Sequence, residues 1–296
     1  MQSIYEAVTA RIVNELGQGT APWVKPWTSK GGSTDLPSNA ATGRPYSGVN
    51  VLLLWGAAIE KGYAQGKWLT FRQAQTLGAR VRKGERAKHI VFASQADAKK
   101  GNSAEEDRTY RFLKFHAVFN ITQVDDLPVA LYQVPEPRAL PDALHEADRF
   151  ITAIGATVHH GGSRAAYAPE PDIILLPSRE SFETDAHYIA TSLHEHGHWT
   201  GHPSRLGRDL RGRFGDACYS AEELVAELTA AYLCAHLGVP GKLRHPEYIA
   251  SWLQVLKSDK QAIFTAAGKA TAAATYLRKV ADPNDTAEKT VAEAAA

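Results

Sequence analysis

The chain has 296 residues, of which 44% are hydrophobic and 22% charged, and its formal net charge is +1. That length predicts two domains, and that apolar content excludes a wholly disordered chain. Two cysteines are too few for a disulfide scaffold. The longest apolar stretch, residues 51–59, is about half the roughly 20 residues that a membrane-spanning helix needs, and the N-terminus has no secretory signal pattern. These features predict a cytoplasmic protein with no membrane partner.

Charge is distributed unevenly along the chain. Residues 1–135 hold 17 Lys and Arg against 11 Asp and Glu, whereas residues 136–296 hold 16 against 21. A basic half followed by an acidic half predicts two domains with different functions. Prolines cluster between residues 128 and 141 and favour an extended linker there. We therefore expect a first domain over residues 1–130, a linker over 131–141, a second domain over 142–281 and a flexible tail over 282–296.

The first domain begins with an amphipathic pattern that predicts a helix, with Ile4, Val8, Ile12 and Leu16 on one side. Polar residues and glycines over 28–48 predict a loop. Residues 88–94 and 108–124 alternate like paired strands, and the polar stretch 95–107 between them predicts a second loop. The predicted class is α+β with a small antiparallel sheet.

Basic and aromatic residues alternate through the first domain. Aromatic rings stack on unpaired bases, and lysines and arginines follow the phosphates, so this composition favours single-stranded DNA over a duplex. The alternative is that the charges are an ordinary solvated surface and the tryptophans core residues; we expect Trp55, which follows an apolar run, to be buried. The candidate DNA contacts are Trp23, Lys25, Trp27, Arg44, Tyr46, Arg72, Arg82, Lys83 and Lys88.

The second domain has strong helix and strand signals. A helix is predicted over 142–155, short strands over 156–160 and 172–177, and a helix from about 185 to 201. A further helix follows over 219–238.

The helix predicted over residues 185–201 contains the motif HExxH. His194 and His198 are one turn apart on one face, so two imidazoles can bind one cation, and Glu195 beside them can act as general base on a water molecule. His196 faces the other side, where a structural role is expected. The alternative is that these histidines bind no metal.

A metal centre of this kind needs a third protein ligand and a position open for water. Acids on the next helix supply candidates, with Glu222 expected to face solvent. Glu223 and Glu227 resemble the pattern of zincin peptidases, which implies Glu223 as ligand and Glu227 as the acid that orients a ligand histidine. Ser220 and Glu223 also fit a helix capping box, in which case Glu227 would be the ligand.

Several motifs in order resemble the ArdC-type plasmid antirestriction proteins, which share their first part with TraC-type primases. The resemblance is carried by TGRPYSGVN (42–50), WLTFRQA (68–74), FHAVFNITQ (115–123), HEHGHWTGHPSRLGRD (194–209) and YSAEELVAEL (219–228). It implies an N-terminal domain that binds single-stranded DNA and a C-terminal zincin-like metallopeptidase domain. It also implies a role in protecting incoming conjugative plasmid DNA from host restriction, inside the recipient cell.

Two functions stay open on the sequence alone. In one, the protein is a metallopeptidase recruited to single-stranded DNA and acting on a protein substrate or a partner in the restriction system. In the other, it is a non-catalytic protector whose metal site is only structural. The ligand types indicate Zn²⁺, with Mn²⁺ or another divalent ion as an alternative.

Overall fold

The computed structural model describes residues 3–18, 21, 23, 36–97, 109–133, 138–210, 217–240 and 246–284. The helices in these ranges are α1 (Ile4–Gly17), α2 (Val49–Lys61), α3 (Phe71–Thr76), α4 (Val129–Tyr132), α5 (Leu140–Ile154), α6 (Asp185–Trp199), α7 (Ala217–Leu237), α8 (Pro246–Ser258) and α9 (Ala262–Ala281). The strands are β1 (Ser38–Asn39), β2 (Lys67–Leu69), β3 (Arg80–Val81), β4 (Lys88–Asp97), β5 (Thr109–Asn120), β6 (Val124–Asp125), β7 (Thr157–His160), β8 (Ala166–Ala168) and β9 (Ile173–Leu176). Within these ranges, no helix is both long and apolar enough to cross a bilayer.

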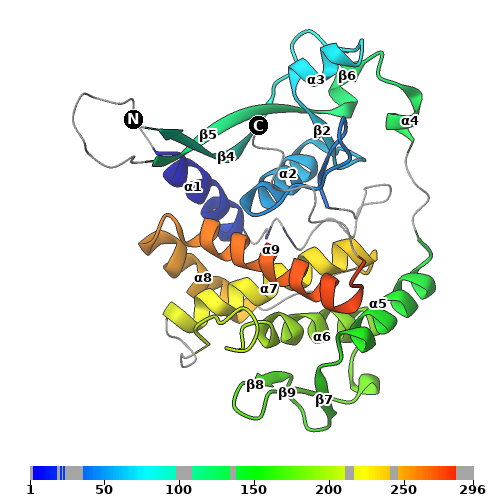
Figure 1. Ribbon diagram of the computed structural model, residues 1–296, viewed down its shortest axis with the longest axis vertical. Helices are drawn as coiled ribbons and strands as arrows, with labels where there is room; N and C mark the ends of the chain where they lie inside the picture. Colours follow the sequence, from blue (N-terminus) through cyan, green and yellow to red (C-terminus); the bar gives the residue numbers. More distant parts are fainter. Residues whose placement is uncertain are drawn as a thin grey trace.

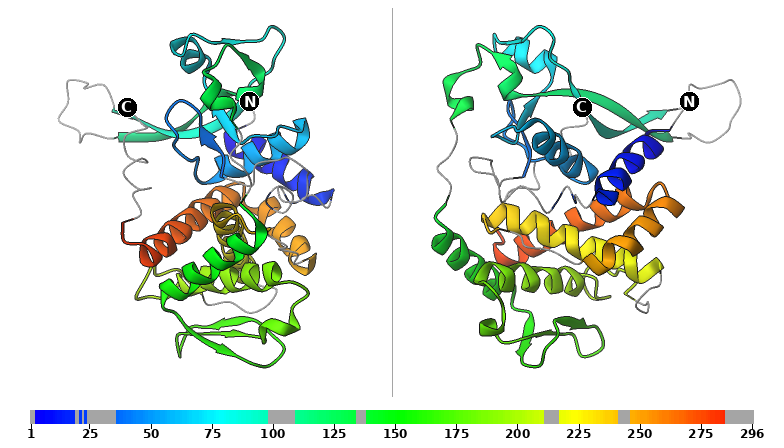
Figure 2. Two further views of the ribbon diagram at one scale, coloured as in Figure 1. Left: turned by 90° about the vertical axis from the view of Figure 1, so that its right-hand side faces the viewer. Right: turned by 180° about the vertical axis from the view of Figure 1, so that it is seen from behind.

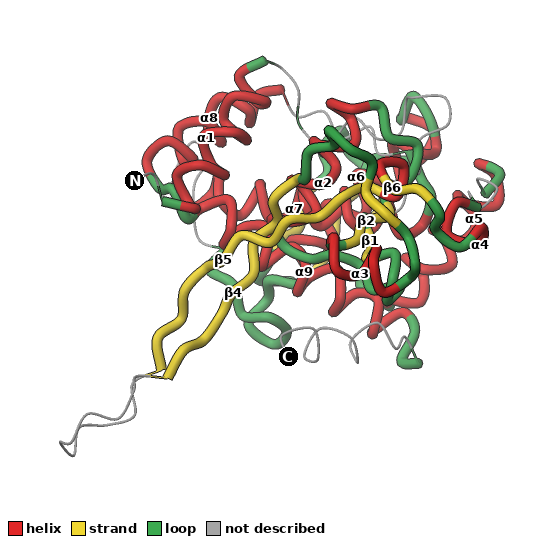
Figure 3. Tube along the Cα trace, turned by 90° about the horizontal axis from the view of Figure 1, so that it is seen from above, coloured by secondary structure: helices red, strands yellow, loops and turns green. Residues whose placement is uncertain are grey.

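The first half is an α+β unit around a four-stranded sheet, in the order β1-β2-β5-β4. Strands β4 and β5 form a long antiparallel hairpin that extends away from the body of the molecule (Figure 3). The short strand β1 pairs with β2 in parallel, so the sheet is mixed, where the sequence predicted an antiparallel one. Strand β4 runs three residues beyond its predicted end at residue 94, whereas β5 lies within the predicted stretch 108–124.

Helix α2 packs between this sheet and the rest of the protein, in contact with β4 and with α9. Its residues 49–57 are all buried, including Trp55 at 4% exposure, which confirms the prediction of a core tryptophan. Asn50 accepts a hydrogen bond from the backbone nitrogen of Val91 and donates one to the carbonyl of the same residue, both at 2.8 Å. This buried amide pairs the helix with strand β4 and leaves no polar group of its side chain unsatisfied.

The second half is mainly helical. Helices α6, α7 and α9 lie side by side, and the three-stranded sheet in the order β7-β9-β8 closes the end of the molecule opposite the β4–β5 hairpin (Figure 1). Strand β9 is central and places Ile174 and Leu176 in the core. The predicted helices and strands of this half are confirmed, with ends that differ by at most two residues.

The two halves share one hydrophobic core. Helix α1 packs on α8, and α2 contacts α9, so helices of the first half lie between its sheet and the helices of the second half (Figure 2). Trp23 packs edge-on against Trp252, with ring centroids 5.9 Å apart. The Thr9 hydroxyl donates to the carbonyl of Lys260 at 2.7 Å. Apolar faces from both halves therefore bury each other.

Candidate metal centre

Helix α6 presents its two histidines to helix α7. The Thr184 side chain caps the helix by accepting a hydrogen bond from the nitrogen of His187 at 3.2 Å. Gly197 lets the two helices come close, since a Cβ built on it would lie 3.1 Å from the Cα of Ala226. The glycine between the two histidines is thus what the close helix contact requires.

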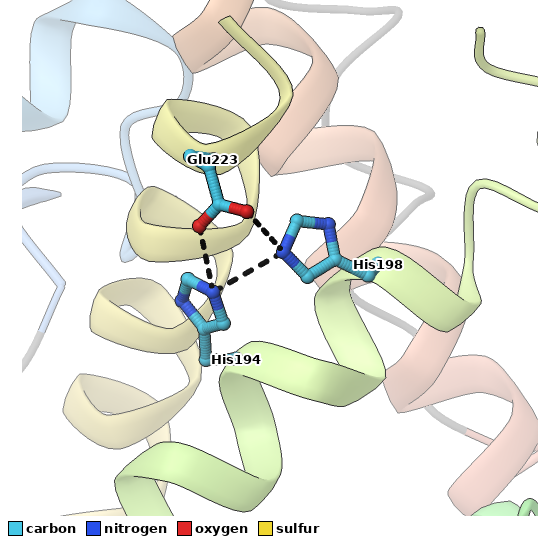
Figure 4. Close-up of side chains that lie close together, drawn as sticks. All are labelled: His194, His198 and Glu223. Carbon is cyan, nitrogen blue, oxygen red and sulfur yellow. Dashed lines mark hydrogen bonds and ion pairs between the residues drawn. The ribbon is translucent and has the colours of Figure 1, made fainter. Parts of the chain in front are cut away.

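The structure brings His194, His198 and Glu223 together (Figure 4). The Nε2 atoms of His194 and His198 lie 3.2 Å apart. His194 Nε2 lies 3.3 Å from Oε2 of Glu223, and His198 Nε2 lies 3.4 Å from Oε1 of the same carboxylate. All three side chains are largely buried. Atoms that bind one ion tetrahedrally at about 2.1 Å lie about 3.4 Å from one another. Two imidazole nitrogens and one carboxylate at this spacing therefore fit a single divalent ion.

The other nitrogen of each imidazole faces a carboxylate. Glu227 Oε2 lies 3.6 Å from Nδ1 of His194, and Glu222 Oε1 lies 3.4 Å from Nδ1 of His198. The expectation that Glu222 faces solvent is wrong, because its side chain is buried against His198 and Arg208. The capping box is also excluded, since Ser220 lies inside α7, which already includes residue 217. Carboxylates in these positions orient imidazoles and fix which nitrogen carries the proton.

Glu195 lies next to these residues and is 5% exposed. Its Oε2 atom is buried and has no hydrogen-bond partner among the residues that the structure describes. Buried carboxylate oxygens are rarely left unpaired. An unpaired one therefore indicates a group that binds a ligand or a water molecule when the protein is active. His196, by contrast, is fully buried with its Nδ1 2.7 Å from the carbonyl of Ser192, and burial lowers its pKa to about 4.

The carboxylates give this site a strong preference for positive charge. Burial by itself lowers the pKa of His194, but hydrogen bonds to Glu223 and Glu227 outweigh it and raise that pKa to about 10. For His198, burial is likewise outweighed by Glu222 and Glu223, and the pKa rises to about 9. The two imidazoles in turn hold the pKa of Glu223 far below its usual value, against the effect of its burial. A cation is therefore stabilised at this point, whether it is a proton or a metal ion.

The residues predicted to contact DNA differ in exposure, as far as the structure describes them. Trp23 is 1% exposed against Trp252, so the expectation that its ring stacks on bases is corrected. Tyr46 is half-buried against the core, and its contact with DNA stays a prediction. Arg44 is half-buried, and Lys25 and Trp27 lie outside the described residues.

Two further candidates are held by acidic neighbours. The Lys88 ammonium lies 2.8 Å from Glu60 Oε2, and Arg82 forms ion pairs with Glu85 and Asp125. Arg72 and Lys83 are exposed.

Next to Arg72, at the first residue of α3, lies Phe71, which belongs to the alternating basic and aromatic stretch but was not among the candidate DNA contacts. Phe71 is 52% exposed.

Each half of the chain matches a known protein family. A family described as "Zincin-like metallopeptidase" matches residues 145–269, and one described as "N-terminal domain of anti-restriction factor ArdC" matches residues 2–119. An uncharacterized protein of Sinorhizobium fredii, y4eC, is 42% identical over 284 residues, which is 93% of this chain and 91% of that protein. A DNA primase TraC of Escherichia coli is 36% identical over 288 residues, covering 90% of this chain and 26% of the primase. This chain thus spans about a quarter of the primase.

Two solved structures of one protein are also similar. They are the metal-free and the Mn(II)-bound crystal structures of the antirestriction protein ArdC from plasmid R388, both 38% identical to this chain. The metal-free structure has a TM-score of 0.82 and covers 95% of this chain and 98% of that one. The Mn(II)-bound structure has a TM-score of 0.78 and covers 95% and 99%.

Proposed function

Because the chain belongs to the ArdC family of antirestriction proteins, we propose that it protects incoming conjugative plasmid DNA from host restriction by binding single-stranded DNA and by acting through a metal-dependent peptidase centre. The primase TraC, similar over nearly the whole of this chain, supports contact with DNA. The zincin-like match to the second half supports the peptidase centre.

One observation carries the catalytic part of this proposal. The His194, His198 and Glu223 donor atoms converge on one point, and beside them Glu195 has a buried oxygen without a partner among the described residues. These three residues would hold the ion, which would supply polarisation of a peptide carbonyl and a lowered pKa of water. Glu195 would take a proton from water and pass it to the leaving amine. A purely structural metal site has no use for such a base.

The ligand set favours Zn²⁺, while the similar R388 protein was crystallised with Mn(II). We propose one divalent ion per chain. The test is metal content after dialysis: one equivalent supports the centre, and no retained metal in protein supplied with either ion contradicts it.

Replacing the base tests catalysis. Glu195→Gln keeps the size of the side chain and removes the proton acceptor, so metal content and DNA affinity should stay as in the wild type. Plasmid transfer into a restricting recipient should then fall to the level seen without the protein. If the Glu195→Gln variant still protects the plasmid from restriction, the proposed peptidase function is wrong and the metal site is structural.

The DNA contact is proposed at the exposed part of the basic half. Arg72 and Lys83 are exposed and basic, and Phe71 offers a ring for stacking. For single strands, the logarithm of affinity falls with the logarithm of salt by about 0.7 per neutralised phosphate. The double variant Arg72→Ala, Lys83→Ala should therefore flatten that slope by about 1.4 in fluorescence anisotropy.

The matched control is Arg164→Ala, an exposed arginine of the second half. Its slope should equal that of the wild type. An unchanged slope in the double variant contradicts this DNA face, and the absence of any binding to single strands contradicts the DNA function itself.

A further inference from the structure

One arginine of the loop after helix α6, Arg208, contacts α6, the helix that carries both histidines. Arg208 is 5% exposed at its side chain. Its Nη1 donates to the Thr200 hydroxyl at 2.7 Å, and its Nη2 donates to the carbonyl of Gly197 at 2.7 Å. Gly197 lies inside the HExxH motif and Thr200 directly follows α6, so this guanidinium fixes the end of the helix that carries both histidines.

The same guanidinium holds Glu222 of helix α7. Nε and Nη2 of Arg208 donate to the Glu222 carboxylate at distances between 2.7 and 3.2 Å. Oε1 of that carboxylate lies 3.4 Å from Nδ1 of His198. A continuous chain of contacts thus runs from the loop through Arg208 and Glu222 to the imidazole whose Nε2 faces Glu223.

The arginine also offsets an unusual accumulation of negative charge. Four carboxylates, those of Glu195, Glu222, Glu223 and Glu227, are at most 9% exposed and lie around the two histidines. One divalent ion neutralises only two of them. A buried carboxylate without a cation is strongly disfavoured, and the Arg208 guanidinium contacts that of Glu222.

We propose, on the basis of the metal centre put forward above, that Arg208 and Glu222 act as a positioning pair. Glu222 accepts the Nδ1 proton of His198, which leaves the Nε2 lone pair for the ion that the site would hold, and Arg208 holds the Glu222 carboxylate in place. Arg208 touches neither metal nor substrate. It sets the affinity and the geometry of the centre through His198.

Arg205 provides a matched control in the same loop. Its side chain is 8% exposed and stacks over the Trp199 ring, and it forms hydrogen bonds with Asp172, Tyr167 and the carbonyl of Trp199. It anchors the loop to Tyr167 of β8, to Asp172 just before β9 and to the last residue of α6, and none of these partners is a ligand histidine or Glu222. Loosening of the loop alone would therefore affect both arginine variants alike.

The experiment measures Mn(II) and Zn(II) affinity by competition with a chelator for Arg208→Met, Glu222→Gln and Arg205→Met in the full chain. We expect Arg208→Met and Glu222→Gln each to lower affinity about 10- to 100-fold. The double variant should lose little more than either single one, because both act through one contact. Arg205→Met should stay within about threefold of the wild type, and Arg208→Lys, which keeps the charge without the planar fork, should fall between.

A spectroscopic readout separates positioning from loss of folding. With Co(II) as probe, the ligand-field absorption should shift in Arg208→Met and Glu222→Gln and stay unchanged in Arg205→Met. Glu222→Gln is nearly isosteric, so it keeps the proposal testable if Arg208→Met fails to fold. Wild-type affinity and spectrum in both variants, or an equal loss of affinity in Arg205→Met, would overturn the positioning pair. A wild-type protein that takes up no metal would instead overturn the metal centre itself.

Discussion

Gly197 offers a sharp test of how closely helices α6 and α7 must approach. Replacing a helix glycine by alanine normally stabilises a protein by about 0.5–1 kcal/mol, because glycine loses more backbone freedom on folding. At position 197 the new Cβ would lie 3.1 Å from the Cα, 3.3 Å from the carbonyl oxygen and 3.4 Å from the Cβ of Ala226. Two of these neighbours are backbone atoms, which cannot turn away, and overpacking of this kind costs about 1–3 kcal/mol.

The overlap is therefore expected to outweigh the helix preference, and Gly197→Ala should lower the free energy of unfolding by about 1–2 kcal/mol. Separating the helices also moves Glu223 away from the two histidines, so metal affinity should fall. Urea denaturation of the metal-free protein measures the first effect, and chelator competition measures the second.

Gly268 in α9 is the control. It is exposed, and a Cβ built on it meets nothing within 4 Å. Gly268→Ala should therefore raise the free energy of unfolding by up to about 1 kcal/mol without any effect on metal affinity. Equal stabilisation by the two substitutions would falsify the claim that close packing at Gly197 positions the metal site.

Three more outcomes are expected from the same structure. Trp23→Ala should cost about 3–5 kcal/mol in urea denaturation because its ring is buried, whereas Trp23→Phe should leave affinity for single-stranded DNA unchanged; loss of DNA binding with unaltered stability would contradict that role. A thiol reagent should label one cysteine in the folded chain, the exposed Cys218, because Cys234 is fully buried and burial raises its pKa to about 12; labelling that persists at one equivalent in Cys218→Ser would refute this. Hydrogen bonds from Lys88 and Lys61 lower the pKa of Glu60 to about 2, and a lowered carboxyl pKa adds stability above pH 4.5 that is lost as the pH falls towards 2. The carboxylate is half exposed, so Glu60→Gln should cost at most about 1 kcal/mol at pH 7 and nothing near pH 2, as acid titrations of the two unfolding curves would show.

The part of the metal site that follows from helix periodicity could be predicted from sequence. His194 and His198 are one turn apart on one element, and local geometry alone puts them on a common face. The choice between Glu223 and Glu227 needed the register of α7 against α6, for which the sequence offered only a resemblance. In the structure, Glu223 faces both Nε2 atoms and Glu227 faces one Nδ1 atom.

Contacts between distant elements were the part that sequence reasoning missed. Glu222 looked like a solvent-facing residue because nothing local indicates that an arginine from the preceding loop covers it. Trp23 looked like a stacking residue because its neighbours in sequence are basic, but its neighbour in space, Trp252, is more than two hundred residues away. Residue type predicts chemistry, whereas burial depends on which apolar faces meet in the folded chain.

The contact between the first helix and the last two has a consequence for how the protein is made. The Thr9 hydroxyl of α1 donates a hydrogen bond to the carbonyl of Lys260, which lies in the short connection between α8 and α9, 251 positions later. At a synthesis rate of 5–20 residues per second, the first helix waits about 10 to 50 s on the ribosome before its packing partners emerge. Its apolar face, with Val8, Ile12 and Leu16, is uncovered during that time. Final folding must therefore follow completion of the chain, and a nascent chain cut short after the basic half would carry that uncovered face as a site for aggregation or for a chaperone.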